Sequence, residues 1–443
     1  MSADTLTVRR SGPLRGNCRV PGDKSISHRA LLFGALAGGV VEASGLGRGG
    51  DNLSTAAALR ALGVDITLAG DAARVRGVGF AGLSAAAGAL DCGNSGTTIR
   101  LMMGLLAGRP FESELYGDAS LTRRPMRRVA EPLRRMGATI DGRVDPARPG
   151  DVFPPVRVRG GALAGIAYDL PVASAQLKSA LVLAGLQAKG KTTLREPGRS
   201  RDHTERMLGA MGAPIAVDAS GAVVVDPEGW NGKLRAIPIV IPGDLSSATF
   251  LFVAAATVAG SDVSVENVGL NPTRSGALDA LAAMGADIDI APEGDALGEP
   301  VGRVRVRASR LRGTRIAGEL ALRSLDEIPA LAVAAALAEG DTVFADLAEL
   351  RVKESDRIVA VARELRRAGV AVEERPDGLV VSGLGGRPPA GGTVQPEHDH
   401  RIAMAGAVMG LSAGDETAVP AADIATSFPS FADTLRALGA EIS

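Results

Sequence analysis

The chain has 443 residues, of which 46% are hydrophobic and only 3% are aromatic. This length is sufficient for two or three domains with cores of their own. The 49 basic and 50 acidic side chains nearly cancel, so the surface as a whole should not attract nucleic acid or anionic lipid. The scarcity of aromatic residues also argues against a surface that stacks bases. Any anion-binding site must therefore be a local concentration of basic residues.

The N-terminal stretch MSADTLTVRRSGPLRG lacks the apolar core of a signal peptide. Apolar runs such as FLFVAAATVAG are far shorter than the ~20 residues that a membrane span needs. The two cysteines, Cys18 and Cys92, form no paired motif, which suits a reducing cytosol and provides no metal framework. We therefore expect a cytoplasmic protein with no metal ion and no organic cofactor.

The stretch VPGDKSISHRALLFGALAGG, residues 20–39, places polar and basic residues at the start of an apolar helix. Lys24, Ser25 and Arg29 fall in its first turns, where backbone N–H groups are unpaired and already positive. Basic side chains are unfavourable there unless an anion shares the site. The motif therefore predicts an anion-binding site at the beginning of this helix.

A helical pattern that ends in a small residue, a glycine and a second small residue recurs at intervals of about 75 residues. Copies include ALRALGVDIT, PLRRMGATID and TLRALGAEIS, each with an alternating stretch after the glycine that predicts a strand. The six glycines are Gly63, Gly137, Gly212, Gly285, Gly369 and Gly439. These positions predict six helices that each end at a glycine.

A second helix, apolar on nearly all sides and therefore expected to be buried, recurs in phase with the first. The copies that begin at VPGDKSIS and IPGDLSSA are the most similar, and they stand three units apart. This spacing predicts an α/β protein of two domains with three units each. We expect residues 23–241 to form an inserted domain, and residues 1–22 plus 242–443 to form the other.

One motif resembles a dinucleotide site but does not fit the repeat. Gly45-x-Gly47-x-x-Gly50 follows a predicted strand and precedes a helix. The same position in another unit reads GRSRDHTER, so this is the ordinary strand-to-helix turn of the repeat. We do not expect NAD binding.

Basic residues recur at the helix starts of all six units, and arginine suits bidentate capture of phosphate and carboxylate. They are Lys24, Arg29, Arg100, Arg123, Arg124, Lys178, Arg199, Arg201, Arg274, Lys353, Arg357 and Arg401. CGNSGTT, residues 92–98, adds backbone N–H groups and hydroxyls at another helix start. Asp326 and Glu354 stand beside these cations and could serve as acid or base groups. The set predicts an anion-binding cleft at one end of the units.

Several motifs together resemble the EPSP synthase family of 3-phosphoshikimate 1-carboxyvinyltransferases. They include PGDKSISHRA, GNSGTT, RRPM, VASAQLKSA, RDHTE, LDEIPALAVAAALAEG, LRVKESDR, DHRIAM and IATSFPSF. The resemblance runs from about residue 8 to the C-terminus. It implies two domains of three βαβαββ repeats, an inside-out α/β barrel, that close on a central cleft. It also implies transfer of the enolpyruvyl group of phosphoenolpyruvate to the 5-hydroxyl of shikimate 3-phosphate, with release of phosphate, in chorismate biosynthesis.

Motif matches imply roles for individual residues. Shikimate 3-phosphate would be bound by Lys24, Ser25, Arg29, Ser174, Gln176, Arg201, Asp326 and Lys353. Phosphoenolpyruvate would be bound by Lys24, Asn94, Gly96, Arg124, Gln176, Arg357 and Arg401. The resemblance implies that Asp326 takes the 5-hydroxyl proton and that Glu354 and Lys24 shuttle protons. Ala175 replaces a second serine of some relatives, and Thr426-Ser427 stands where many relatives have a lysine.

Three alternatives remain at this point. A sister enzyme that acts on UDP-N-acetylglucosamine typically has Lys-Asn in the first motif and a loop cysteine, whereas this chain has Lys24-Ser25 and no such cysteine. A non-catalytic metabolite-binding protein would not need Asp326 or Glu354. The near-zero net charge argues against an RNA-end-processing enzyme.

We expect a monomer that binds no nucleic acid or membrane. We also expect inhibition by glyphosate, because Gly96 leaves room beside phosphoenolpyruvate.

Overall fold

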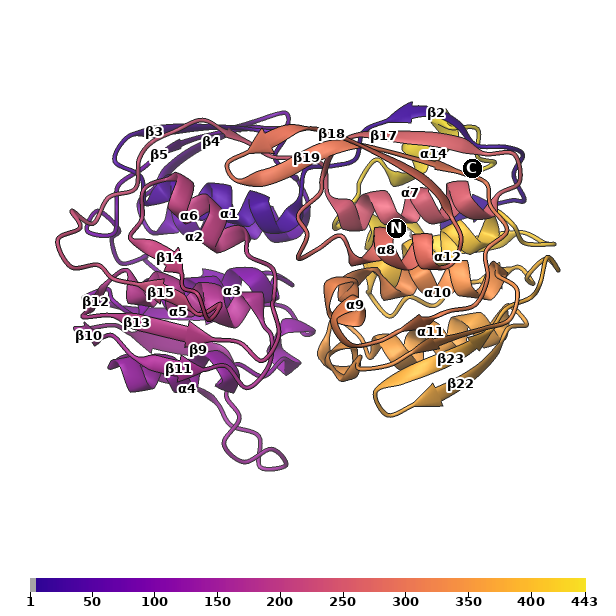
Figure 1. The fold of residues 1–443 in the computed structure, drawn as a ribbon. Helices are drawn as coiled ribbons and strands as arrows, with labels where there is room; N and C mark the ends of the chain where they lie inside the picture. The colour runs from indigo at the N-terminus through magenta and orange to yellow at the C-terminus, as the bar shows by residue number, and fades with distance from the viewer. Residues whose placement is uncertain (1–4) are drawn as a thin grey trace. The chain divides into compact units, whose positions relative to one another are not determined.

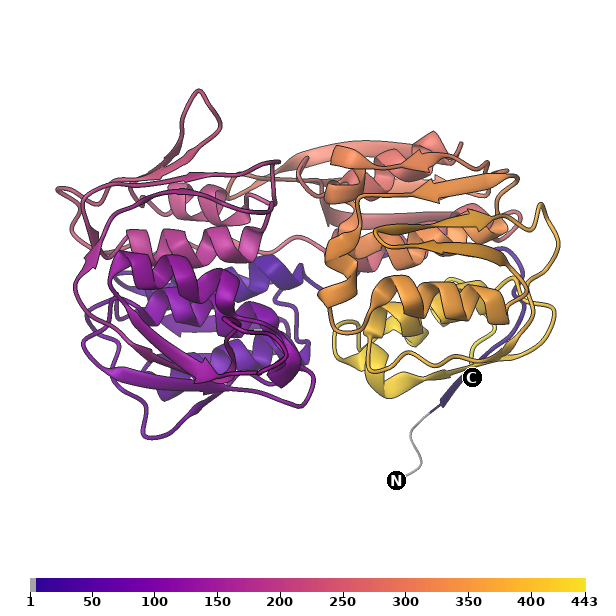
Figure 2. The same cartoon turned by 90° about the horizontal axis from the view of Figure 1, so that it is seen from below.

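The computed structural model describes residues 5–443, which divide into two compact units. The inserted unit consists of Gly22–Ile241 together with Ala296–Glu299. The split unit consists of the residues up to Pro21, Pro242–Asp295 and Pro300–Ser443. Within each unit the sheets lie on the outside and the most apolar helices lie between them (Figures 1 and 2). Each unit therefore has a hydrophobic core built around its own central helices.

The inserted unit contains three four-stranded sheets of the same topology. In each, the first strand is parallel to the second, and the later pairs are antiparallel. The first sheet is β16 (Ile239–Val240), β3 (Val40–Ser44), β5 (Ala72–Arg76) and β4 (Asp65–Ala69). The second is β6 (Leu90–Asp91), β7 (Glu112–Tyr116), β9 (Phe153–Arg159) and β8 (Thr139–Arg143). The third is β11 (Ala167–Asp169), β13 (Thr192–Arg195), β15 (Val223–Val225) and β14 (Ile215–Val217), and β10 (Leu163–Ala164) pairs separately with β12 (Ala188–Lys189).

The split unit repeats this arrangement, with a shorter last sheet. The first sheet is β18 (Asp287–Ala296), β19 (Glu299–Arg307), β17 (Asp262–Gly269) and β2 (Arg15–Cys18). The second is β20 (Arg315–Ile316), β21 (Asp341–Phe344), β23 (Gly378–Ser382) and β22 (Ala371–Arg375). The third is β1 (Thr5–Val8), β25 (Thr417–Pro420) and β24 (Gly392–Thr393). The predicted class, a two-domain α/β fold built from six similar units, is confirmed.

One helix of each repeat is central and almost wholly buried, as its uniformly apolar sequence predicts. These helices are α1 (Lys24–Ala35), α3 (Gly96–Leu106), α5 (Ala175–Gly185), α7 (Leu245–Thr257), α10 (Ile328–Leu337) and α12 (His400–Gly410). Five of the six begin at a side-chain cap that accepts a backbone N–H, which satisfies one of the unpaired donors of the first turn. Asp23 and Asp244 supply this cap in the two matching PGD motifs. The polar ends of these helices are therefore fixed by local hydrogen bonds.

The second helix of each repeat has one buried and one exposed face. These helices are α2 (Gly50–Ala61), α4 (Arg127–Met136), α6 (His203–Ala210), α8 (Gly276–Ala283), α11 (Arg357–Arg367) and α14 (Phe431–Ala437). All six predicted glycines follow them with φ between 81° and 114°, a left-handed conformation that disfavours other residues. The helix ends predicted from the repeat are thus confirmed.

Short helices complete the split and inserted units. They are η1 (Leu121–Arg123), α9 (Gly318–Arg323), η2 (Leu325–Glu327), η3 (Ala348–Val352) and α13 (Ala421–Ala425). The elements η2 and η3 are important for the site because they precede α10 and α11. Asp326 lies within η2, and Glu354 lies between η3 and α11. Across residues 5–443, every helix is too short or too polar to cross a membrane.

Candidate active site

The first turn of α1 places Lys24 beside an acid from the next helix. Lys24 Nζ lies 2.9 Å from Oδ2 of Asp51, which is in the first turn of α2. Both side chains are only partly buried, at 22% and 18% exposure. The backbone carbonyl of Lys24 also accepts a hydrogen bond from Nδ2 of Asn52. The ammonium is therefore held near the start of α1 while it keeps a path to solvent.

The guanidinium of Arg29 is buried one turn further along α1, and its three contacts are to neutral oxygens. Nε donates to Oγ1 of Thr204 and Nη2 donates to Oγ of Ser179, both at 2.7 Å. Nη1 donates to the backbone carbonyl of Ser25 at 2.9 Å. Burial lowers the pKa of Arg29 to about 10, an effect opposed by the charge of Glu205 and reinforced by that of Arg201. This cation would gain from an anionic ligand.

His28 packs beneath the same turn and is fully buried. Its Nδ1 lies 2.7 Å from Oγ1 of Thr55, whose hydroxyl lies 2.7 Å from that of Thr98. Burial lowers the pKa of His28 to about 3, so the imidazole is neutral at physiological pH. His28 is therefore part of the support for α1 and not a cation of the site.

At the start of α3, Arg124 and Asn94 are linked. Nη2 of Arg124 donates to Oδ1 of Asn94 at 2.6 Å and to Oγ of Ser120 at 3.1 Å. Nδ2 of Asn94 donates in turn to Oδ2 of Asp118 at 2.6 Å. Arg124 is 7% exposed and thus mostly buried. This network orients a guanidinium beside the N-terminus of α3, a natural position for an anion.

Gln176 joins α5 to α3. Its Oε1 accepts from Nη1 of Arg100 at 2.7 Å, and its Nε2 donates to Oγ1 of Thr97 at 2.9 Å. Gly96 is the first residue of α3 and is buried, and a Cβ added to it would lie 2.7 Å from Nη1 of Arg100. Ser174 is the cap of α5, and its hydroxyl accepts from the N–H of Leu177 at 3.4 Å.

The split unit brings Asp326 and the LRVKESDR motif together. Oδ1 of Asp326 lies 3.3 Å from Nζ of Lys353 and 3.2 Å from Nη1 of Arg357. Nη2 of Arg357 lies 2.7 Å from Oε2 of Glu354. The side chains of Asp326 and Glu354 are 16% and 19% exposed, whereas that of Arg357 is 1% exposed. Two reachable carboxylates therefore flank one buried guanidinium.

Arg401, in the first turn of α12, lies against the same group. Its Nη1 donates to the backbone carbonyl of Asp326 at 2.8 Å and lies 3.9 Å from Oε1 of Glu327. Asp399 caps α12 and contacts Nε of Arg357 at 2.8 Å. Arg401 is 6% exposed. All five predicted residues of the split unit, Asp326, Lys353, Glu354, Arg357 and Arg401, thus form one cluster.

Comparison with known proteins identifies the family of this arrangement. The family model of EPSP synthase (3-phosphoshikimate 1-carboxyvinyltransferase) matches residues 8–435. The chain is 51% identical to 3-phosphoshikimate 1-carboxyvinyltransferase of Synechococcus sp. (strain JA-3-3Ab) over 440 residues, 99% of this chain and 97% of that protein. It is 52% identical to the enzyme of the same name from Desulforudis audaxviator (strain MP104C), over 99% of this chain and all of that protein.

The chain belongs to the EPSP synthase family. A solved EPSP synthase of Acinetobacter baumannii has the same fold, with a TM-score of 0.86, 42% identity and 99% of each chain covered. The resemblance predicted from the motifs is therefore confirmed over nearly the whole chain. The sister enzyme that acts on UDP-N-acetylglucosamine is not favoured by these matches.

The sequence analysis did not identify three acids that contact the predicted site residues of this EPSP synthase family member. Asp51, Asp118 and Asp399 each contact a predicted site residue or its partner. A comparison of the starts of the central helices could have indicated Asp399, because Asp399 occupies the capping position that Asp23 and Asp244 occupy in other repeats. Asp51 and Asp118 have no such signal, because they lie between a strand and the second helix of their repeat or in the first turn of that helix, and not at the cap of a central helix.

Two of the cations at helix starts, neither of them assigned to a substrate, are paired with buried carboxylates. Lys178 is 2% exposed and is held between Glu196 and Glu205, each 2.7 Å from Nζ. Arg274 is 3% exposed and lies 2.5 Å from Oδ1 of Asp244. Both are neutralised by buried carboxylates, which the sequence pattern of cations alone does not reveal.

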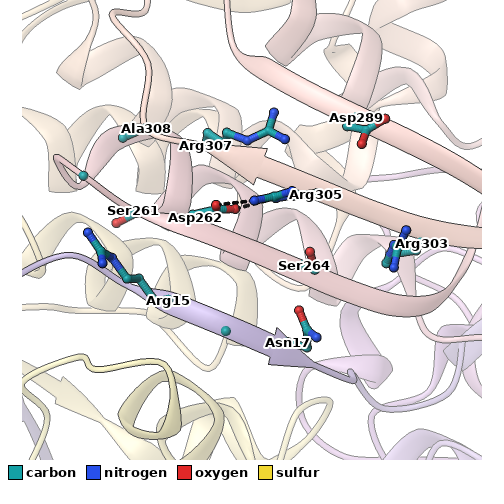
Figure 3. Close-up of a pocket in the computed structure, with 12 residues that line it drawn as sticks. Arg15, Asn17, Ser261, Asp262, Ser264, Asp289, Arg303, Arg305, Arg307 and Ala308 are labelled. Carbon is teal, nitrogen blue, oxygen red and sulfur yellow. Dashed lines mark hydrogen bonds and ion pairs between the residues drawn. The ribbon is translucent and has the colours of Figure 1, made fainter.

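An open pocket on the outer face of the first split-unit sheet contains none of the predicted site residues (Figure 3). It is lined by Arg15, Gly16, Asn17, Gly260, Ser261, Asp262, Ser264, Asp289, Arg303, Arg305, Arg307 and Ala308. Arg305 pairs with Asp262 across neighbouring strands, with Nη2 2.5 Å from Oδ2. Equivalent cross-strand pairs such as Arg159 and Glu112, at 2.7 Å, lie on another sheet. The pocket therefore belongs to a ladder of surface charges that stabilises the sheets.

Proposed function

We propose that the chain is the enzyme that its family implies, a 3-phosphoshikimate 1-carboxyvinyltransferase. It transfers the enolpyruvyl group of phosphoenolpyruvate to the 5-hydroxyl of shikimate 3-phosphate and releases phosphate. The observation that carries this proposal is the match to curated enzymes of this name at about 50% identity over nearly the whole chain. The clustering of Asp326 and Glu354 around Arg357 supports a catalytic rather than a purely binding role.

Shikimate 3-phosphate carries a phosphate and a carboxylate, so its binding requires fixed cations and hydroxyl or amide donors. We assign Lys24, Arg29 and Arg201 as the basic residues of the inserted unit for this substrate. Ser25, Ser174 and Gln176 are assigned as polar contacts, and Lys353 and Asp326 are assigned from the split unit. The buried Arg29, whose guanidinium donates hydrogen bonds to three neutral oxygens, supports this assignment most strongly.

Phosphoenolpyruvate is assigned to a second set of residues. We propose that Arg124, Arg357 and Arg401 neutralise its phosphate and carboxylate, since each is at most 7% exposed and is fixed by hydrogen bonds. Asn94, Gln176 and Lys24 add polar contacts, and Gly96 allows the ligand to approach the backbone at the start of α3. Fixed cations of this kind stabilise developing charge without reorganisation during the reaction.

The reaction has two stages, an addition and an elimination, and each stage requires two proton transfers. In the addition, Asp326 accepts the 5-hydroxyl proton while the hydroxyl oxygen attacks C2 of phosphoenolpyruvate, and an acid protonates its methylene carbon. In the elimination, the resulting methyl group loses a proton, the C2–O bond to phosphate breaks, and phosphate leaves. We assign Glu354 and Lys24 to the transfers at the methylene and methyl carbon and at the departing phosphate.

Release of inorganic phosphate tests this proposal directly. The purified protein is incubated with phosphoenolpyruvate alone, with added shikimate 3-phosphate, and with added UDP-N-acetylglucosamine. We expect release only with shikimate 3-phosphate. Release with UDP-N-acetylglucosamine instead would assign the chain to the sister reaction, and tight binding without any release would indicate a non-catalytic protein.

We also propose that the enzyme works as a monomer in the cytoplasm. Both cysteines are free thiols. Burial raises the pKa of Cys18 to about 11, with a further contribution from Glu266, and raises that of Cys92 to about 12. Such thiols react slowly and suit a reducing compartment. Sedimentation of the purified protein, with and without both substrates, tests the monomer.

A further inference from the structure

Three ionisable side chains are buried together in the inserted unit, next to the support of Arg29. Lys178 of α5 lies between Glu196, which follows β13, and Glu205 of α6, with Nζ 2.7 Å from an oxygen of each. Their side chains are 2%, 10% and 7% exposed. The proposed reaction assigns no role to any of the three.

This group is not neutral by itself, because two carboxylates surround one ammonium. Burial acts to lower the pKa of Lys178, but the charges of Glu205 and Glu196 and their hydrogen bonds outweigh it and raise the pKa. Lys178 is therefore a cation at physiological pH. Within the described chain, Oε1 of Glu196 and Oε2 of Glu205 are buried and have no hydrogen-bond partner. One negative charge of this group remains to be balanced by a neighbouring cation.

Arg29 is a cation close to this group, and it is linked to the group through two adjacent hydroxyls. Ser179 follows Lys178 on α5, and Thr204 precedes Glu205 on α6. Their hydroxyl oxygens lie 2.6 Å apart, and each accepts a hydrogen bond from Arg29 at 2.7 Å. The Ser179 hydroxyl donates to the carbonyl of Ala175 at 2.6 Å, which leaves its oxygen to accept from the guanidinium. Among the nearby acids, Glu205 has the largest electrostatic effect on Arg29.

We propose that Lys178 is a positioning residue that keeps Arg29 available to shikimate 3-phosphate. By pairing with Glu205, Lys178 offsets the carboxylate that would otherwise compete with the substrate for the guanidinium. It also ties α5 to α6, so that Ser179 and Thr204 stay in place to orient Arg29. This inference rests on the proposed assignment of Arg29 to shikimate 3-phosphate.

The test is calorimetric binding of shikimate 3-phosphate alone to Lys178→Met, together with steady-state kinetics. Methionine has nearly the same length as lysine but leaves Glu205 without its ammonium. We expect the Kd for shikimate 3-phosphate to rise by at least about tenfold, while the KM for phosphoenolpyruvate changes by less than about threefold. Lys191→Met is the matched control, since Lys191 is an exposed lysine of the same unit that pairs with Asp226 at 3.3 Å. It should bind as the unmodified protein does.

The double variant Lys178→Met/Glu205→Gln separates positioning from simple structural damage. It removes the competing carboxylate as well as the ammonium, so we expect its Kd to return to within about threefold of the unmodified value. If Lys178→Met does not fold, the double variant carries the test by itself. If both variants fold, a Kd for the double variant as high as that of the single variant would overturn the proposal. If only the double variant folds, a Kd about tenfold above that of the unmodified protein would overturn it.

Arg29→Lys distinguishes failure of this inference from failure of the substrate assignment. Weaker binding in Arg29→Lys with unchanged binding in Lys178→Met would overturn the role of Lys178 only. Unchanged binding in Arg29→Lys would contradict the assignment of Arg29 and the inference that rests on it.

Discussion

Nε of Arg357 lies 2.8 Å from Oδ2 of Asp399, and the two side chains are 1% and 0% exposed. Burial acts to lower the pKa of Arg357, but the charges of Asp399, Glu354 and Asp326 raise it above its ordinary value. Burial likewise acts to raise the pKa of Asp399, but Arg357 lowers it. Oδ1 of Asp399 also accepts the backbone N–H of Arg401 at 3.0 Å. One buried carboxylate therefore fixes both arginines that we assign to phosphoenolpyruvate in the split unit.

Replacing Asp399 should affect stability and substrate binding together. Asn can still cap α12, but it removes the charge that faces Arg357, and we expect Asp399→Asn to lower the free energy of unfolding by about 3 kcal/mol. The KM for phosphoenolpyruvate should rise at the same time. Asp262→Asn is the control, because its ion pair with Arg305 is exposed and should contribute little to stability. Urea denaturation and steady-state kinetics measure both effects, and equal losses in the two variants would contradict this account.

The carboxylates of Asp326 and Glu354 should matter for turnover more than for folding. Both are partly exposed, so Asp326→Ala and Glu354→Ala should fold normally. Loss of a positioned acid or base typically reduces the rate by ~10²–10⁴-fold, and we expect kcat to fall by this factor. Asp377→Ala, at an exposed position on the same unit, should leave kcat unchanged. Near-normal turnover in either test variant would refute the role assigned to that residue.

His28 should make the fold sensitive to acid. The folded protein keeps this imidazole neutral down to about pH 3, whereas the unfolded chain binds a proton near the ordinary value of 6.5. The unfolded state therefore holds more protons between these values, and the contribution of this group to stability is lost as the pH falls from 6.5 toward 3. The expected slope is at most about 1.4 kcal/mol per pH unit.

Urea denaturation at several pH values measures this slope in the unmodified protein and in His28→Asn. Since asparagine does not titrate, the variant should lose stability less steeply between about pH 6 and pH 4. His398→Asn is the control, because the His398 side chain is 92% exposed. Identical slopes for the unmodified protein and His28→Asn would show that His28 is not the group responsible.

A methyl group at Gly96 should disturb the guanidinium groups around the start of α3. The added Cβ would lie 2.7 Å from Nη1 of Arg100 and 3.2 Å from Nη1 of Arg124, so these side chains must shift. We expect Gly96→Ala to raise the KM for phosphoenolpyruvate and to raise the inhibition constant of glyphosate, the longer ligand, by a larger factor. Gly161→Ala is the control, since its Cβ would meet no atom within 4 Å. An unchanged inhibition constant would exclude this steric explanation.

The repeat architecture was predictable because it depends on local sequence. Each amphipathic helix must end where a glycine permits positive φ, so Gly63 and Gly439 indicate the same local structure far apart in the chain. The partners of the charged residues were not predictable in this way. Arg357 and Asp399 are 42 residues apart, and the contact depends on how the starts of α11 and α12 pack. For the same reason, the sequence did not distinguish the buried Lys178 from the partly exposed Lys24.

The most direct test of the central claim is the structure of the reaction product. The purified enzyme is incubated with shikimate 3-phosphate and carbon-13-labelled phosphoenolpyruvate, and the mixture is followed by NMR. The account predicts an enolpyruvyl ether on the 5-oxygen, formed in equal amount with inorganic phosphate, and almost none of it with Asp326→Ala. A labelled group on another oxygen, or phosphate released without an ether product, would contradict the assigned reaction.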